Sequence, residues 1–314
     1  MEMNEIVVRV PATTANLGSG FDVLGLALSL DNELHFIPEE GHFADVMMTA
    51  EGEGLATLAI TPQNIIFRAM EETAKVIGKP LPAGRMHAVN RIPFARGLGS
   101  SSAAIVSGVV LANALLGAPL SENDMLQIAA RVEGHPDNVA PALLGGFVVS
   151  MMEDGVCTSV KIPVADTWKA VVAIPDYELM TEEARAVLPT SYSRADAVHN
   201  ISAVSFLLTS FFTQNPTYLA RGFSDRIHVP YRIGLIPGGE DVMENAKAAG
   251  AFGATISGSG STMIAFADAA HAKNVGEAMQ KVFAAKDMES RVLILDFNTS
   301  GATVEMRKNA FEKA

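Results

Sequence analysis

Residues 93–103 read Pro-Phe-Ala-Arg-Gly-Leu-Gly-Ser-Ser-Ser-Ala and have the composition of an anion-binding loop. Gly97 and Gly99 carry no Cβ, so the backbone there can come close to a ligand. The serines open an apolar run that we expect to be a helix, and free N–H groups at a helix N-terminus favour phosphate. Serine hydroxyls can also donate to phosphate oxygens or bind Mg²⁺. The alternative interpretation is an ordinary turn that happens to contain Gly and Ser.

This segment differs from the common nucleotide-binding motifs. A Walker loop has a Lys after its last glycine, and a dinucleotide fingerprint has a third glycine where Ser102 stands. Bound phosphates would therefore be held mainly by backbone and hydroxyl groups. Two other segments, 11–22 and 253–262, are also rich in small and hydroxyl-bearing residues. Three such loops, far apart in the chain, suggest one site assembled from distant segments.

Bulk composition narrows the class of protein. The chain has 314 residues, 49% of them apolar, and a net charge of −12, which argues against nucleic-acid or anionic-membrane partners. Cys157 is the single cysteine, so no disulfide forms within the chain. We see no apolar signal core and no uninterrupted membrane span. We therefore expect a cytoplasmic enzyme or binding protein.

Hydrophobic spacing and turn residues predict the order of helices and strands. We expect Pro11 to end a first strand, 11–22 to be an ordered loop, 23–30 to be helix or strand, and 33–61 to hold short strands with a turn at 39–41. The other predicted helices are 64–77, 102–116, 121–131, a short one capped by Thr181, 193–212, 240–249 and 269–284, and the other predicted strands are 6–10, 86–92, 145–152, 168–174, 255–257, 262–267 and 291–297. This alternation lacks a steady βαβ rhythm, so we predict an α+β protein with antiparallel sheets in two domains.

Residues 93–103 resemble the phosphate-binding motif of the GHMP kinases, and 11–22 and 253–262 resemble the first and third motifs of that family. The order is the same and the resemblance spans nearly the whole chain. Within the family, 11–22 and the Glu-Gly-His-Pro-Asp-Asn-Val-Ala-Pro segment at 133–141 are similar to the members that phosphorylate L-homoserine. The resemblance implies a two-domain GHMP kinase fold. Residues 1–160 would form an N-terminal ATP-binding domain with a left-handed βαβ unit, and residues 161–314 a C-terminal ferredoxin-like α/β domain.

The implied activity is ATP-dependent phosphorylation of the L-homoserine hydroxyl, giving O-phospho-L-homoserine in threonine biosynthesis. Two alternatives stay open: a GHMP kinase for another small alcohol such as mevalonate, and a non-catalytic ligand sensor with the same fold. Glu133 and the intact serine-rich loop speak against a sensor, which need not keep metal and phosphate ligands. Small-molecule substrates are the expected partners, and a homodimer is an expectation from the family.

The resemblance also assigns the substrate-binding residues. Arg185 and Arg232 would bind the carboxylate, because a planar guanidinium can make two parallel hydrogen bonds to it; the alternative is two surface arginines. Asn16 and Asp22 would meet the ammonium and other polar groups of the substrate, although Asp22 could instead cap a loop. Thr181, Ser259, Gly260 and Gly258 would complete the pocket wall.

Catalysis would centre on the segment that follows Glu133. Asn138 would hold the substrate hydroxyl, with His135 beside it, and His135 could equally be a structural histidine. Two interpretations of Asp137 stay open: it takes the proton of the substrate hydroxyl as a general base, or the site has no such base. We favour a mechanism without a strong base, since positioning and charge neutralisation supply most of the catalysis in phosphoryl transfer. Arg185 would take part in catalysis together with Asn138 and Asp137.

ATP and Mg²⁺ are the cofactors that the resemblance implies. Glu133 and Ser101 (or Ser100) would be the metal ligands, and Asn64 would lie near the adenine. The remaining ATP-binding residues would be those of the loop itself: Pro93, Phe94, Ala95, Arg96, Gly97, Leu98, Gly99, Ser100, Ser101, Ser102 and Ala103.

Overall fold

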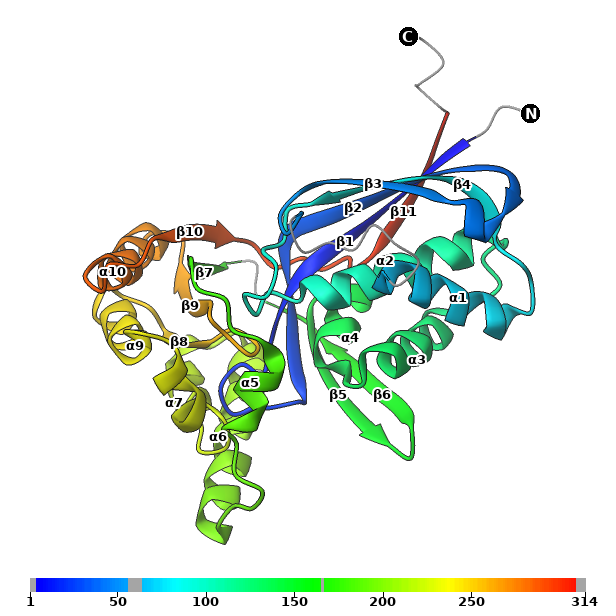
Figure 1. Cartoon of the computed structure of the whole chain (residues 1–314). Helices are drawn as coiled ribbons and strands as arrows, with labels where there is room; N and C mark the ends of the chain where they lie inside the picture. Colours follow the sequence, from blue (N-terminus) through cyan, green and yellow to red (C-terminus); the bar gives the residue numbers. More distant parts are fainter. Residues whose placement is uncertain (1–3, 56–63, 165–166, 309–314) are drawn as a thin grey trace.

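The computed structural model describes residues 4–55, 64–164 and 167–308, which form two β-sheets with helices packed against them (Figure 1). Residues 56–61, the end of the predicted strand region, lie outside this description. None of the helices that it contains is long and apolar enough to cross a membrane.

The first sheet holds seven of the described strands, in the order β11-β1-β2-β4-β3, with β5 paired to β2 and β6 paired to β5. Both ends of the chain contribute, because the C-terminal strand pairs with the start of the first one. The strands are β1 (Asn4–Ala15), β2 (Leu24–His42), β3 (Met47–Gly52), β4 (Pro82–Asn90), β5 (Phe147–Glu153), β6 (Val156–Ile162) and β11 (Thr303–Lys308). The proposed division of the chain at 160/161 stays a prediction.

Two predictions about the first strands are wrong. Pro11 does not end β1, which continues to Ala15 with a register shift between Pro11 and Ala12. A bulge accommodates proline because the ladder there does not need its missing N–H. The predicted turn at 39–41 is also absent: β2 runs through it to His42, held by pairing with β4. The open choice at 23–30 is resolved as strand.

Helices α1 to α4 lie together beside the first sheet (Figure 1). Their bounds are α1 (Ile65–Ile77), α2 (Ser100–Leu115), α3 (Glu122–Glu133) and α4 (Pro136–Leu144), and the short turn η1 (Phe43–Asp45) precedes β3. Helix α1 connects β3 to β4, which pair in parallel, an exception to the predicted antiparallel pairing. The side chains of Asn64 and Ser121 cap α1 and α3.

Helix α2 is the central helix of this layer. Its side chains are apolar on nearly every side, and most are buried against α1, α3, α4 and β1. Gly108 permits the close approach of α1, because a Cβ there would lie 2.5 Å from the Ile66 carbonyl oxygen. The predicted central buried helix is confirmed, and its N-terminus is fixed in the middle of the molecule.

The second sheet is antiparallel, in the order β10-β7-β9-β8. Numbered along the chain, this is the 4-1-3-2 order of a ferredoxin-like domain, as predicted. Its strands are β7 (Trp168–Pro175), β8 (Gly253–Ile256), β9 (Met263–Asp268) and β10 (Ser290–Leu295), and its helices and short turns are α5 (Thr181–Ala186), α6 (Arg194–Thr213), η2 (Pro216–Tyr218), α7 (Leu219–Gly222), α8 (Val229–Arg232), η3 (Ile233–Leu235), α9 (Gly239–Ala248) and α10 (Ala272–Ala284).

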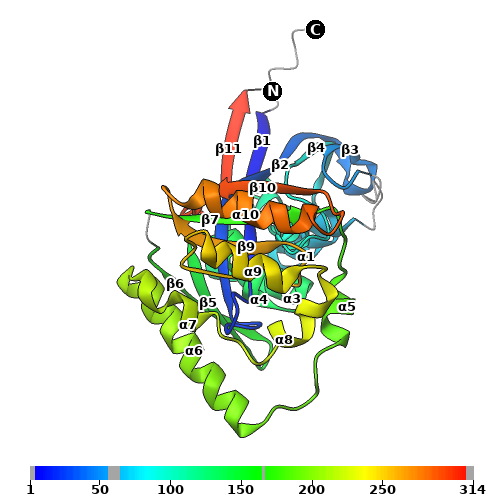
Figure 2. The same cartoon turned by 90° about the vertical axis from the view of Figure 1, so that its left-hand side faces the viewer.

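The two faces of this second sheet are covered differently. Helices α9 and α10 pack on one face, where they lie side by side in Figure 2. The other face joins the core of the first sheet through α6, whose Phe211 stacks on Phe147 of β5 with ring centroids 4.2 Å apart. This shared core holds the two sheets in a fixed relation on either side of the loops that connect them.

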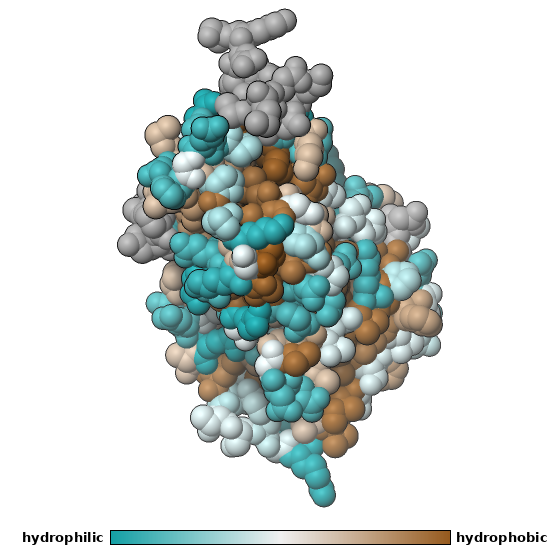
Figure 3. Space-filling model, turned by 90° about the vertical axis from the view of Figure 1, so that its right-hand side faces the viewer, coloured by the Kyte–Doolittle hydropathy of each residue, from teal (hydrophilic) through white to brown (hydrophobic). Residues whose placement is uncertain are grey.

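The surface mixes hydrophilic and hydrophobic residues, as the face in Figure 3 shows. Large exposed apolar side chains occur on several elements, among them Val156 and Val160 on β6 and Ile201 and Phe212 on α6.

Candidate active site

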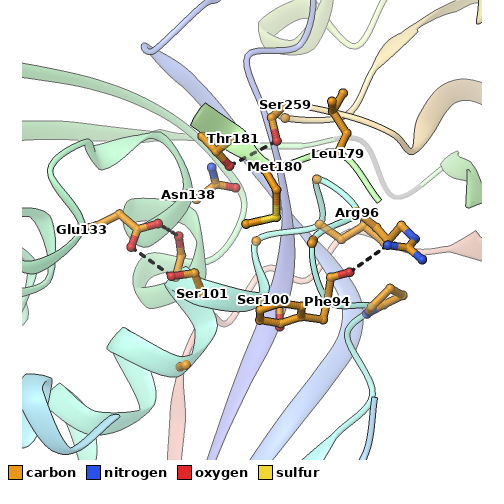
Figure 4. Close-up of a pocket in the computed structure, with 18 of the residues that line it drawn as sticks. Phe94, Arg96, Ser100, Ser101, Glu133, Asn138, Leu179, Met180, Thr181 and Ser259 are labelled. Atoms are coloured by element: carbon orange, nitrogen blue, oxygen red, sulfur yellow. Dashed lines mark hydrogen bonds between the residues drawn. The ribbon is translucent and has the colours of Figure 1, made fainter. Parts of the chain in front are cut away.

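One cavity of about 480 Å³ lies where the loops of the two halves meet, and it is lined by segments that are far apart in the sequence. Residues 93–102 form one wall, and the segment from Glu133 to Asn138 forms another. Leu179, Met180, Thr181, Arg185, Arg232 and residues 258–259 add further lining. Figure 4 labels side chains from residues 93–102, from Glu133 and Asn138, from Leu179 to Thr181, and Ser259. The volume is within the usual range of small-molecule sites.

The glycine loop leads directly into the N-terminus of α2. Gly99 is the N-cap with φ +71°, and Gly97 has φ +74°. Ser257 Oγ donates to the Gly97 carbonyl at 2.7 Å, and a Cβ on Gly97 would lie 2.2 Å from the Ser257 carbonyl oxygen. Only glycine fits at position 97, so the segment 253–262 fixes the conformation of the loop at 93–103. The first turn of α2 contains no acidic residue, and its free N–H groups form an anion-binding position.

Two serines of this first turn face a carboxylate on α3. Ser102 Oγ donates to Glu133 at 2.7 Å, and the corresponding distance from Ser101 is 3.4 Å (Figure 4). Within the described residues no three His, Cys, Asp or Glu side chains cluster to hold a metal. A carboxylate with neighbouring hydroxyls suits Mg²⁺, which prefers oxygen ligands and usually takes the rest from phosphate and water. The residues present therefore fit the ion, and Ser102 is a candidate that the sequence analysis did not assign to it.

Arg185, on α5, is bound by the loop that follows β1. Both of its terminal nitrogens donate to the Asp22 carboxylate, at 2.7 and 3.0 Å, and this carboxylate raises the pKa of Arg185. Asn16 in turn accepts the Asp22 backbone N–H at 3.0 Å. Asp22 does not itself line the cavity, and it acts on the site through Arg185. The sequence analysis placed Thr181 as the cap of α5; the N-cap is Met180, and Thr181 is the first helical residue.

Arg232, at the end of α8, is a buried cation among neutral groups. Its side chain donates to the Ala184 carbonyl at 2.8 Å and lies 3.4 Å from His228 Nδ1. No carboxylate in the described residues is within ion-pair distance of it. Burial, together with the nearby Arg185 charge, lowers the pKa of Arg232 to about 10. Both guanidinium groups lie over the Phe21 ring, at 5.0 and 5.6 Å from its centroid. This corner of the cavity is electropositive and can accept a carboxylate.

The segment after α3 supplies three further polar side chains. His135 caps α4, and its Nδ1 lies 2.7 Å from the carboxylate of buried Asp137, which raises the pKa of His135. Asn138 Oδ1 accepts from Thr13 Oγ1 at 2.7 Å, so the amide NH₂ is the end that a ligand would meet. Thr13 was missed in the sequence because nothing near it indicates a partner 125 positions away.

Nearly all of the residues assigned from the sequence lie at this one cavity. The exceptions are Asp22, Gly260 and Ala103, of which Ala103 is buried in the core on α2. Some lining residues were not assigned, and most carried no sequence signal. One of them, Asn32, accepts the backbone N–H groups of Arg91 and Ile92 at 2.8 and 3.0 Å and so orients the end of β4 before the loop. The unassigned lining residues are Asn32, Glu53, Ile65, Ile66, Asn90, Ala104, Leu179 and Met180.

Comparisons with known proteins agree with this architecture. The GHMP kinases N terminal domain matches residues 64–146 and the GHMP kinases C terminal domain matches residues 215–285. A homoserine kinase of Moorella thermoacetica is 44% identical over 300 residues, which are 95% of this chain and 99% of that protein.

Two other relatives agree. A homoserine kinase of Picosynechococcus sp. is 41% identical over 304 residues, 96% of this chain and 100% of that protein. The crystal structure of homoserine kinase from Cytophaga hutchinsonii aligns with a TM-score of 0.89 at 32% identity, covering 96% of this chain and 97% of the other. The resemblance seen in the three glycine-rich segments is thereby confirmed, and the chain belongs to the GHMP kinases and, within them, to the homoserine kinase family.

Proposed function

We propose that this chain transfers the γ-phosphoryl group of ATP to the side-chain hydroxyl of L-homoserine, giving O-phospho-L-homoserine and ADP. The observation that carries the proposal is the continuity of the cavity: one end is the N-terminus of α2, and the other is the corner formed by Arg185 and Arg232. A phosphate donor and an amino-acid acceptor can thus occupy one space. Holding both reactants in reacting geometry is most of what phosphoryl transfer requires.

The phosphate end of the cavity would bind ATP. The N–H groups of residues 97–102 would donate to the phosphate oxygens, and Asn64 with neighbouring lining residues would meet the adenine. Glu133, with Ser101 or Ser102, would hold Mg²⁺. When bound, this ion would neutralise charge that develops on the phosphates.

At the other end, Arg232 and Arg185 would bind the substrate carboxylate, and Asn16 would lie toward its ammonium. Asp22 would act through Arg185, which it holds in place. Asn138 would position the hydroxyl for attack on the γ-phosphorus. Asp137 already accepts a hydrogen bond from His135 in a buried position, which makes it a poor base. The proposal therefore keeps a mechanism without a strong general base.

Neither alternative accounts for the site as well. Mevalonate has a carboxylate for the two arginines but no ammonium, and the relatives that match over the whole chain at 41% and 44% identity are homoserine kinases. A sensor would not need the contact between Glu133 and the loop serines. A cytoplasmic location and a homodimer stay predictions.

Substrate analogues that each lack one group test the proposal. ADP release would be measured with MgATP and L-homoserine, 4-hydroxybutanoate (no ammonium), 3-aminopropan-1-ol (no carboxylate), mevalonate, or no acceptor. We expect turnover with L-homoserine and a loss of about 30- to 150-fold in kcat/KM for either truncated analogue, which is about 2–3 kcal/mol for each lost charged contact. Equal turnover of 4-hydroxybutanoate and L-homoserine would refute the assignment of an ammonium site.

A further inference from the structure

We propose that Arg96 is a positioning residue that connects the phosphate-binding loop to the segment carrying Thr181 and Arg185, and so sets the distance between the two ends of the active site. This inference rests on the proposed function. It differs from the role assigned to Arg96 by family resemblance, in which the side chain would bind ATP.

The guanidinium of Arg96 is fully engaged away from the N-terminus of α2. Its Nε donates to the Pro175 carbonyl at 3.1 Å, and Nη2 donates to Asp176 at 3.1 Å. Nη1 lies 3.3 Å from the Glu178 carboxylate. Pro175 is the last residue of β7, Asp176 and Glu178 lie in the connection from β7 to α5, and the Arg96 side chain is 13% exposed among them. A phosphate would have to displace two carboxylates to reach it.

The connection that Arg96 holds leads directly into the substrate end of the cavity. Leu179, Met180 and Thr181 line the cavity immediately after Glu178, and Figure 4 shows Arg96 and Leu179 on the same side of the site. A second bond supports the arrangement, since the Leu179 N–H donates to the Ala95 carbonyl at 3.4 Å. Arg185 follows five residues after Met180, so the same segment carries the arginine of the substrate end.

The loop itself has anchors that do not depend on the Arg96 side chain. Ser257 Oγ holds the Gly97 carbonyl at 2.7 Å, and the Thr262 N–H donates to the Arg96 carbonyl at 3.2 Å. Removing the guanidinium should therefore leave the phosphate-binding loop built, while the β7–α5 connection keeps only the weak Leu179–Ala95 backbone bond to that loop. The expected defect is in the relative placement of the two substrates, because an error of about 1 Å in placement can cost about 100-fold in rate.

A double-mutant cycle separates this role from direct phosphate binding. We would compare Arg96→Met, the double variant Asp176→Asn/Glu178→Gln, and their combination, with Arg85→Met as a control. Arg85 forms a similar pair with Glu39, at 2.8 Å, away from the cavity. Asp176 and Glu178 are 79% and 57% exposed, so neither substitution should prevent folding.

We expect Arg96→Met to lower kcat about 10- to 100-fold. The carboxylate variant should lower it about 2- to 10-fold, as for two partly exposed ion pairs, and should add nothing in the Arg96→Met background. Arg96→Lys should fall between wild type and Arg96→Met, because it keeps the charge without the fork. Calorimetric affinity for MgADP should stay within about threefold of wild type in every variant. A loss of about tenfold or more in MgADP affinity for Arg96→Met, with a carboxylate variant that behaves like wild type, would show a direct phosphate ligand and overturn the inference.

Amide hydrogen exchange of residues 176–181 tests the connection without any substrate. Faster exchange there in Arg96→Met and in the carboxylate variant, but not in Arg85→Met, would support the inference. Unchanged exchange in Arg96→Met and in the carboxylate variant would refute the inference about Arg96. Inactivity of the wild type on L-homoserine is a separate outcome, which would refute only the proposed function.

Discussion

Replacing Arg232 by Met should have opposite effects on stability and on substrate binding. The side chain is 1% exposed, and its hydrogen-bond partners are neutral. Its pKa of about 10 in the folded protein is well below that of an ordinary arginine. At 1.36 kcal/mol for each unit of pKa, burial therefore costs the charged form roughly 3 kcal/mol. Methionine fills a similar space without this cost.

The free protein should accordingly keep or gain stability in Arg232→Met. The lost hydrogen bonds, to the Ala184 carbonyl above all, offset part of the gain, so we expect a change between about 0 and +3 kcal/mol. Binding should suffer instead, because removing one partner of a buried, hydrogen-bonded charge pair costs about 2–5 kcal/mol. That corresponds to a roughly 30- to 4,000-fold rise in the KM for L-homoserine.

The assays are thermal unfolding of the ligand-free protein and steady-state kinetics at saturating MgATP. Arg194→Met, which removes an exposed arginine at the start of α6, is the control and should change neither quantity. A clear fall in the unfolding temperature of Arg232→Met with an unchanged KM for L-homoserine would refute the reasoning, since it would make Arg232 a structural cation.

Three further predictions concern the loop, the metal and pH. Gly97→Ala should lower MgADP affinity at least tenfold more than Gly117→Ala does. Both glycines have positive φ, but only at Gly97 would a Cβ meet backbone atoms, so equal effects would show that the close packing at Gly97 does not matter for binding. Glu133→Gln should raise the Mg²⁺ concentration needed for half-maximal activity about tenfold or more, while Glu122→Gln at the other end of α3 should not, and indistinguishable metal titrations would argue against Glu133 as a ligand. Burial lowers the pKa of His228 to about 4, below its value in the unfolded chain, so the unfolded state binds more protons between about pH 6.5 and 4 and stability falls as pH falls through that window. The free energy of unfolding of the wild type, measured in urea, should therefore fall by about 2 kcal/mol between pH 7 and pH 5. A His228→Gln variant whose stability falls just as steeply would contradict this prediction.

Local patterns predicted what depends on local chemistry. Ser121 begins a helix because its side chain accepts the backbone N–H of Asp124 three residues later, a relation visible in the sequence. Strand ends were less predictable. Glu39, Glu40 and Gly41 have the composition of a turn, yet β2 continues through them. Strand β4 pairs with Glu39 and with His42, and the ladder is irregular between these two residues.

The candidate site divides in the same way. Residues 93–102 were identified from their own composition and do line the cavity. The contact of Glu133 with Ser102 rather than mainly Ser101 depends on the rotation at which α2 meets α3, and one residue changes that rotation by about 100°. The neutral surroundings of Arg232 come from Phe21 and His228, which meet only when the loop after β1 and the start of α8 are brought together by the fold.

The most direct test of the account is the identity of the product. Wild-type protein would be incubated with MgATP and L-homoserine, and the mixture followed by ³¹P NMR and mass spectrometry. The account predicts a phosphate monoester on the side-chain oxygen of homoserine, formed in equal amount with ADP. ATP consumption that yields only inorganic phosphate, or no consumption by folded protein that binds MgADP, would contradict it.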